Sequence, residues 1–178
     1  MKKIIILFAF ILVSNNGFGQ KKGRFKPGVK LVENIVVSEI DSTSSILFIF
    51  EGHTHLINFY LDLTENLSGQ FKEVNKKIDF NYNLTAPNSL EADINSIPKE
   101  KFKPINYDLI CLIKQSDINS WDNHKIDKRK QNYNLILELK KRDNNQIIET
   151  AILNVNSYYT IATQNRNSSK FIYELITQ

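Results

Sequence analysis

The segment Tyr133-Asn134-Leu135-Ile136-Leu137-Glu138-Leu139-Lys140 carries the pattern that decides the fold class of this chain. Its odd-numbered positions from 133 to 139 are apolar, and the positions between them are polar except for Ile136. A period of two places alternate side chains on opposite faces of a β-strand, one toward a core and one toward water. The segment therefore predicts a strand of a sheet that is covered on one face.

Similar patterns recur along the chain. Ile78–Leu84 and Phe171–Leu175 alternate in the same way, whereas Ile46–Phe50 and Leu109–Ile113 are apolar throughout. The continuous apolar runs are typical of central strands that are covered on both faces. We predict eight or nine strands, at residues 29–40, 45–51, 55–63, 70–84 (which could hold two), 105–114, 132–141, 147–155, 158–163 and 171–176.

Turn residues separate several of these predicted strands. Glu51-Gly52 precedes the alternating segment His55–Leu63, and Asp143-Asn144-Asn145 precedes the strand that begins at Ile147. Both are expected to form hairpins, because Gly, Asn and Asp tolerate the positive φ of tight turns. The best helical candidate is the short segment Ser89–Ile97, which is followed by a proline. With so little helix, we predict an all-β fold, an antiparallel β-sandwich, with a closed β-barrel as the alternative.

The first 19 residues have the order of a secretory signal peptide. Lys2 and Lys3 precede ten consecutive apolar residues, and a small, polar stretch ends at Gly19. As a helix, ten residues span about 15 Å, roughly half of a bilayer core, so no membrane span is expected. We predict export through a cleavable signal peptide (1–19) to the periplasm or outside the cell, a basic flexible leader (20–30), and a single β domain (31–178).

Composition excludes some classes of function. Removal of the first 19 of the 178 residues, with Lys2 and Lys3 among them, leaves 159 residues and a formal charge of +2. Such a small charge, on an exported chain, argues against a nucleic-acid partner. Cys111 is the only cysteine, so no internal disulfide forms, and its apolar neighbours indicate a buried, small hydrophobic residue.

One pair of histidines suggests a metal site. His53 and His55 are two residues apart, so on a strand their imidazoles would lie on the same side. Asp122, His124 or Asp127 would supply a third ligand, and this donor set suits zinc. Packing of His55 alongside Ile57 and Phe59 is the alternative interpretation.

Two long polar connections, 86–104 and 115–131, are the expected binding surface, because long loops in compact domains are often functional. The second contains Trp121, which would contact a sugar or a protein partner, or would cap the sandwich. Tyr158 and Tyr159 would face opposite sides of a strand, so one of the two rings is a candidate partner contact.

The sequence contains no nucleophile elbow, no H-E-x-x-H, no P-loop and no Rossmann glycine motif. Our leading hypothesis is an exported, non-catalytic binding or accessory protein of the bacterial cell envelope that needs no cofactor. Its partner would be a protein, a glycan or another envelope component. The alternatives are a metal-assisted hydrolase that uses His53 and His55, and a carrier of a small apolar ligand with a cavity of about 300 Å³ or more.

Overall fold

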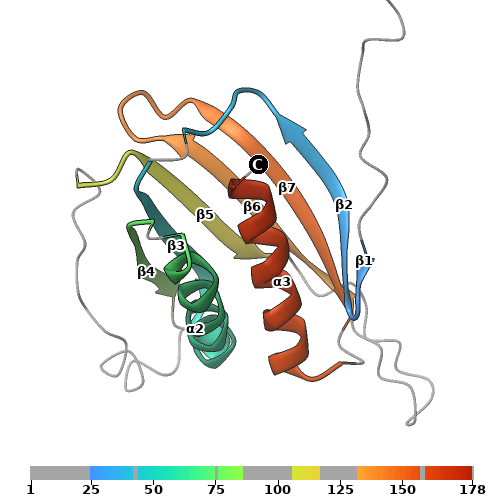
Figure 1. The fold of residues 1–178 in the computed structure, drawn as a ribbon. Helices are drawn as coiled ribbons and strands as arrows, with labels where there is room; N and C mark the ends of the chain where they lie inside the picture. Colours follow the sequence, from blue (N-terminus) through green and yellow to red (C-terminus); the bar gives the residue numbers. More distant parts are fainter. Residues whose placement is uncertain are drawn as a thin grey trace, which may run out of the picture.

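The computed structural model describes residues 25–41, 44–74, 76–85, 106–116, 132–156 and 159–177. These residues form one seven-stranded sheet, in the order β1-β2-β7-β6-β5-β3-β4, with helices α2 and α3 side by side on one face (Figure 1). The elements are β1 (Phe25–Lys26), β2 (Val29–Val36), β3 (Ile46–His53), η1 (Thr54–Leu56), α2 (Ile57–Lys72), β4 (Ile78–Thr85), β5 (Leu109–Gln115), β6 (Asn132–Lys141), β7 (Ile147–Asn156) and α3 (Ile161–Ile176).

The sheet is mixed. Strands β5, β3 and β4 are parallel neighbours, and every other neighbouring pair is antiparallel. The two apolar runs became β3 and β5, which both lie inside the sheet, as predicted. The predicted turn at residues 143–145 joins β6 to β7, and Asn145 has φ 55°. The hairpin predicted at Glu51-Gly52 is wrong, because β3 continues to His53 and then leads into a helix.

The strand predicted at 55–63 is part of η1 and α2 instead. Five side chains of α2 are buried at helical spacing: Phe59, Tyr60, Leu63, Leu67 and Phe71. Leu61, which completes the alternating pattern of the sequence, is 38% exposed. The apolar stripe with period 3.6 therefore overrides the alternation of Ile57, Phe59 and Leu61.

The strands predicted at 158–163 and 171–176 are also wrong, since residues 161–176 form α3. The Thr160 side chain caps the helix by accepting a hydrogen bond from the Thr163 backbone N–H at 3.3 Å. Polar residues hide the helical period in the sequence, because α3 buries Gln164, Asn165, Asn167, Ser168 and Ser169.

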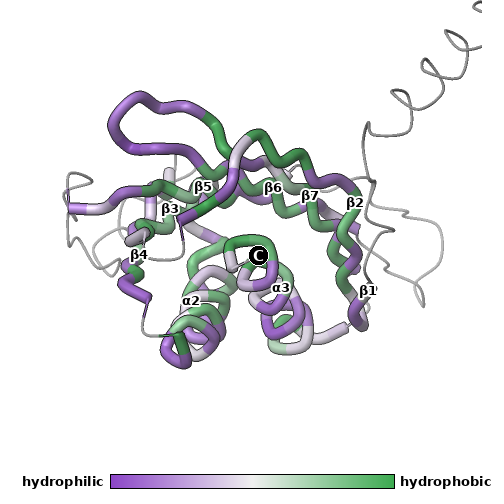
Figure 2. Tube along the Cα trace, turned by 45° about the horizontal axis from the view of Figure 1, so that its top comes forward, coloured by the Kyte–Doolittle hydropathy of each residue, from purple (hydrophilic) through white to green (hydrophobic). Residues whose placement is uncertain are grey.

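The prediction of a strand-dominated chain is confirmed, but the second layer is not a sheet. In the described residues, α2 and α3 occupy the place that a second sheet would fill in a sandwich (Figure 2). The sheet stays open, with β4 at one edge and β1 and β2 at the other, so it is not a closed barrel either.

Aromatic rings fill the space between the helices and the sheet. Phe50 stacks on Tyr60 of α2 with ring centroids 4.8 Å apart, and Phe48 stacks on Phe80 at 5.5 Å. Phe48, Phe50 and Tyr60 are fully buried. This core fixes α2 over β3 and β4 and so sets the position of the residues that precede the helix.

The expected leader and the β domain overlap. Residues 25–30, which we placed in the leader, form β1, a turn at Pro27-Gly28 and the start of β2. Gly28 has φ 79°, so Pro27-Gly28 makes the turn rather than ending a flexible segment. The predicted signal peptide and the predicted helix 89–97 lie outside the described residues. None of the described helices is long and apolar enough to cross a membrane.

Candidate functional site at the carboxyl end of the parallel strands

The ends of three parallel strands define the candidate site. His53, Thr85 and Gln115 are the last residues of β3, β4 and β5. His53 pairs with Thr85 in the register, and Glu51 pairs with Lys114 one residue before Gln115. Parallel strands bring their carboxyl ends to the same edge, and in open, doubly wound α/β folds ligands bind outside these ends.

The passage from β3 into α2 is held in one conformation. Gly52 has φ 146°, a conformation that side chains other than glycine rarely adopt. The hydroxyl of Tyr60 donates to the Glu51 carbonyl at 2.8 Å and accepts from the Gln115 backbone N–H at 3.2 Å. Burial raises the pKa of Tyr60 to about 12, so this hydroxyl stays protonated at neutral pH and keeps joining β3 to β5.

His53 and His55 come together at this edge. Their rings stack with centroids 5.5 Å apart and an interplanar angle of 16°, and both side chains are exposed. The pair does not lie on one strand as predicted, because His53 ends β3 and His55 belongs to η1. The predicted third ligands, Asp122, His124 and Asp127, lie outside the described residues. Within the described part of the chain, no three His, Cys, Asp or Glu side chains are grouped to hold a metal ion.

Both long polar connections leave the sheet from this same end. The first follows Thr85 and the second follows Ser116. The Ser116 backbone N–H donates to the Asn134 carbonyl at 2.8 Å, and the Asn134 N–H donates to the Ser116 hydroxyl at 3.1 Å. These two bonds fix the points between which the second connection runs. Trp121 belongs to it and lies outside the described residues.

The Tyr159 side chain packs against the turn between β1 and β2. A Cβ added to Gly28 would lie 2.8 Å from Cδ2 of the Tyr159 ring, so the ring packs directly on the β1–β2 turn. The Tyr159 carbonyl accepts a hydrogen bond from the Gln164 side chain, whose oxygen accepts from the Tyr133 hydroxyl at 2.7 Å. Tyr159 is exposed, yet these contacts assign it to the junction of β1, β2 and α3. Tyr158 lies outside the described residues.

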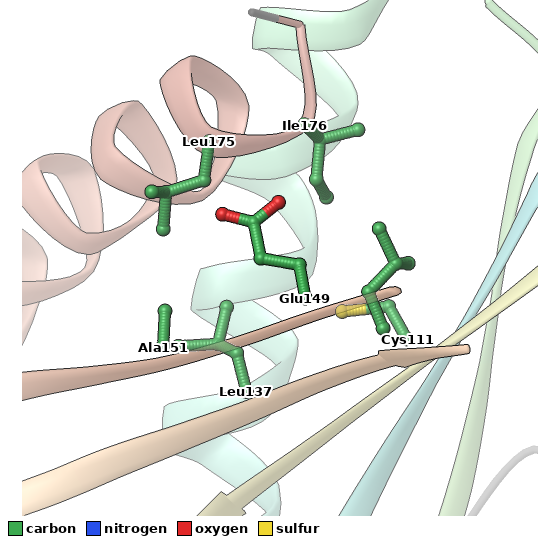
Figure 3. Close-up of a pocket in the computed structure, with 7 residues that line it drawn as sticks. Cys111, Leu137, Glu149, Ala151, Leu175 and Ile176 are labelled. Atoms are coloured by element: carbon green, nitrogen blue, oxygen red, sulfur yellow. The ribbon is translucent and has the colours of Figure 1, made fainter. Parts of the chain in front are cut away.

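A small pocket at the carboxyl end of α3 contains the carboxylate of Glu149, which was not among the predicted site residues. Glu149 points between the sheet and the last turn of α3 and is 6% exposed (Figure 3). The lining side chains are Cys111, Leu137, Leu139, Glu149, Ala151, Leu175 and Ile176. The parity of Glu149 with the apolar Ala151 and Leu153 of β7 is the signal that would have predicted its burial.

This pocket has neither the size nor the chemistry of an active site. The volume open to the centre of a water molecule is about 10 Å³, which is room for about one water. It is therefore too small for the cavity of a ligand carrier. Burial, and after it the charge of Glu149, raises the pKa of the Cys111 thiol far above its ordinary value. Cys111 is 1% exposed, which confirms the prediction of a buried, small hydrophobic residue.

Neither a known family model nor a curated protein sequence matches this chain. Among solved structures, the chain is similar to the PelC dodecamer from Paraburkholderia phytofirmans, with 9% identity and a TM-score of 0.53 over 88% of this chain and 99% of that one. A point variant of that dodecamer gives 8% identity and a TM-score of 0.52, over 84% and 98%.

Lipoprotein GNA1162 from Neisseria meningitidis is more distant, at 11% identity and a TM-score of 0.42 over 75% of this chain and 97% of that one. At these identities the likeness to PelC shows a shared fold. It covers nearly the whole of the PelC chain, so the fold of this chain recurs in another protein.

Proposed function

We propose that this chain is an exported, non-catalytic binding or accessory protein of the bacterial cell envelope. In this proposal it contacts its partner, a protein or an envelope glycan, with the carboxyl end of β3, β4 and β5. The observation that carries the proposal is that the exposed pair His53 and His55 and the starts of both long polar connections meet at this one edge.

The chemistry of the edge suits recognition. Two exposed imidazoles offer hydrogen-bond donors and acceptors, and the Thr85 hydroxyl, which donates to the Gly52 carbonyl at 3.2 Å, offers an acceptor. The Tyr60 hydroxyl ties the neighbouring backbone of β3 and β5 together. The buried reactive groups support a non-catalytic role, because Cys111 and Glu149 line a pocket with room for about one water and no substrate.

The likeness to PelC adds one point. PelC is described as a dodecamer, so a protein of this fold is able to assemble with other chains. We therefore include self-association among the results that the experiment must be able to report.

The experiment is in-cell crosslinking and pull-down of the tagged full chain at its native level of expression, followed by mass spectrometry. One stoichiometric exported partner or a defined glycan is the expected result. Its yield should fall about tenfold or more in the double variant His53→Ser/His55→Ser, since the proposal places both residues among the few central ones whose truncation costs over about 1 kcal/mol. The matched control is Glu65→Ser on the exposed side of α2.

Equal recovery from the histidine variant and from Glu65→Ser would refute the assignment of the binding surface. A clean pull-down, with neither a partner nor a second copy of the chain, would refute the proposal of an adaptor.

A metal-assisted hydrolase is the second candidate, because His53 and His55 lie with ring centroids only 5.5 Å apart. It requires one zinc ion per chain after gentle purification, lost in His53→Ala. Full-length protein that folds with unchanged stability in the presence of a chelator, and that takes up no added zinc, would eliminate it.

A further inference from the structure

The outer edge of β2 is open in the described part of the chain. β7 pairs with β2 from Val29 to Val36, but on the other side β1 pairs only with Val29 and Lys30. From Leu31 onward, no described strand lies beyond β2, so backbone groups along this stretch are available to a further strand.

Exposed apolar side chains gather at this edge. Val32, Ile35, Val36 and Val37 are between 50% and 60% exposed, and Ile147 on the neighbouring strand is 41% exposed. These five are more than half of the nine large hydrophobic residues that are exposed in the described residues. A register shift between Leu31 and Glu33 places Val32 in a bulge, and the Val37 N–H still bonds to β7 at Ile148.

The charges of the same segment have one sign. Beyond Lys30, whose outer side is paired with β1, residues 31–41 contain Glu33, Glu39 and Asp41 and no lysine or arginine. Glu33 and Glu39 are exposed and lie on either side of Val36 and Val37 in the chain. The outer edge of β2 is thus both apolar and acidic. It is separate from the candidate site of His53 and His55, which lies at the carboxyl end of the parallel strands.

We propose that β2 is a docking strand for an extended segment of a partner protein in which apolar and basic residues alternate. The segment adds to the sheet beside Leu31–Val36. Main-chain hydrogen bonds supply affinity. Apolar side chains on one face of the segment cover Val36, and lysine or arginine side chains on the other face extend along Ile35 and pair with Glu33 and Glu39. This inference does not rest on the proposed function.

Charge decides between the possible occupants of the edge. A second copy that paired through its own β2, either parallel and in register or antiparallel about Val36, would bring Glu33 and Glu39 beside the same acids, and like charges across a strand pair are destabilising. An anionic membrane surface would repel them as well. A basic strand is the occupant that the edge attracts.

The test uses the purified full chain and a fluorescently labelled heptapeptide of alternating lysine and valine, with binding followed by anisotropy. We expect saturable binding, with hydrogen-exchange protection gained by those backbone amides of Leu31–Val36 that do not already bond to β7. Neither an alternating glutamate and valine peptide nor the basic peptide with a central proline should bind, because the first has the wrong charge and the second cannot form a continuous strand.

The variant Glu33→Lys/Glu39→Lys should weaken binding by about tenfold or more, since two opposite-charge contacts become like-charge contacts. Glu65→Lys/Glu73→Lys on α2 makes the same change of net charge at exposed sites and should leave binding unchanged. Four results would overturn the proposal: no binding at millimolar peptide, equal loss in both variants, protection outside β2, or a concentration-dependent dimer that Ile35→Lys dissociates.

Discussion

The side-chain amide nitrogen of Asn165 lies 2.8 Å from the carboxylate oxygen Oδ2 of Asp62, and this hydrogen bond joins α3 to α2. The same nitrogen donates to the Phe59 carbonyl, also at 2.8 Å. Asn165 is fully buried, so two acceptors of α2 depend on one side chain of α3. The pairing sets how the two helices lie on the sheet.

Asn165→Ala should therefore destabilise the protein by about 1–3 kcal/mol, because the Asp62 carboxylate and the Phe59 carbonyl both lose the hydrogen bond that Asn165 donates from a buried position. Urea unfolding followed by circular dichroism measures the loss. Arg166→Ala, at the exposed next position of α3, should change the free energy of unfolding by less than about 0.5 kcal/mol. If the two variants lose the same stability, the hydrogen bonds of Asn165 do not hold the helices together.

Gly52→Ala should cost about 1–3 kcal/mol. At φ 146° a side chain is strained, and the added Cβ would lie 3.1 Å from the Leu56 Cδ1. Gly69→Ala is the matched control, since a Cβ there meets nothing within 4 Å and alanine favours the helix by about 0.5–1 kcal/mol. Thermal unfolding should move in opposite directions for the two variants, and a shift in the same direction would contradict the strain at Gly52.

The Cys111 thiol should not react with a thiol reagent in the native protein at pH 8. Its pKa is raised by burial and then by the charges of Glu149 and Glu138, so almost no thiolate forms. Unfolding in urea should expose one reactive thiol per chain. Rapid modification of the folded protein would show that the pocket beside Glu149 opens.

Asp108→Asn should reduce stability at neutral pH by about 1 kcal/mol and flatten the loss of stability in acid. The Asp108 carboxylate accepts from the Ser45 backbone N–H at 2.8 Å and from its hydroxyl at 2.7 Å, and these bonds lower its pKa. A lowered folded pKa gives stability that is present above the ordinary value of 3.8 and is lost as the pH falls through the folded value.

Unfolding of both proteins between pH 2 and pH 7 measures this effect. Parallel pH profiles, with the variant below the parent by the same amount throughout, would mean that the charge of Asp108 contributes nothing.

The strands were predictable where the apolar side chains follow the two-residue alternation of a strand and fit no helical spacing. In β6, alternate side chains from Tyr133 to Leu139 face the helices, and the polar residues between them face away. In α2, the alternation of Phe59, Leu61 and Leu63 coincided with part of a helical stripe, and the burial of Tyr60 together with the exposure of Leu61 distinguishes the helix from a strand. A single sequence does not show which side chains are covered, so the strand was predicted.

The helix α3 was hidden for a different reason. Its buried face includes Gln164, Asn165 and Ser168, which sequence patterns assign to the surface. Their burial depends on partners far away in the chain, such as Tyr133 and Phe59, that no local pattern contains. The missing apolar period made α3 resemble two short strands.

The histidine pair was found from its spacing, although the reason was incomplete. The alternation of a strand was expected to place His53 and His55 on one side, whereas the structure brings them together where β3 passes into η1. The histidine pair lies at the same end of the sheet as Thr85 and Ser116, which precede the two long connections, because β5, β3 and β4 are parallel neighbours. That order depends on contacts between distant strands and was not predictable from the chain.

The most direct test of the account is photo-crosslinking in cells with p-benzoylphenylalanine placed at His55 or at Glu73. Both positions are exposed, and they lie at opposite ends of α2, which is about 24 Å long. If the carboxyl end of the parallel strands is the binding surface, His55 crosslinks to one specific partner and Glu73 crosslinks to none. Crosslinks to the same partner from Glu73 but not from His55 would contradict the claim that this protein binds with the carboxyl end of its parallel strands.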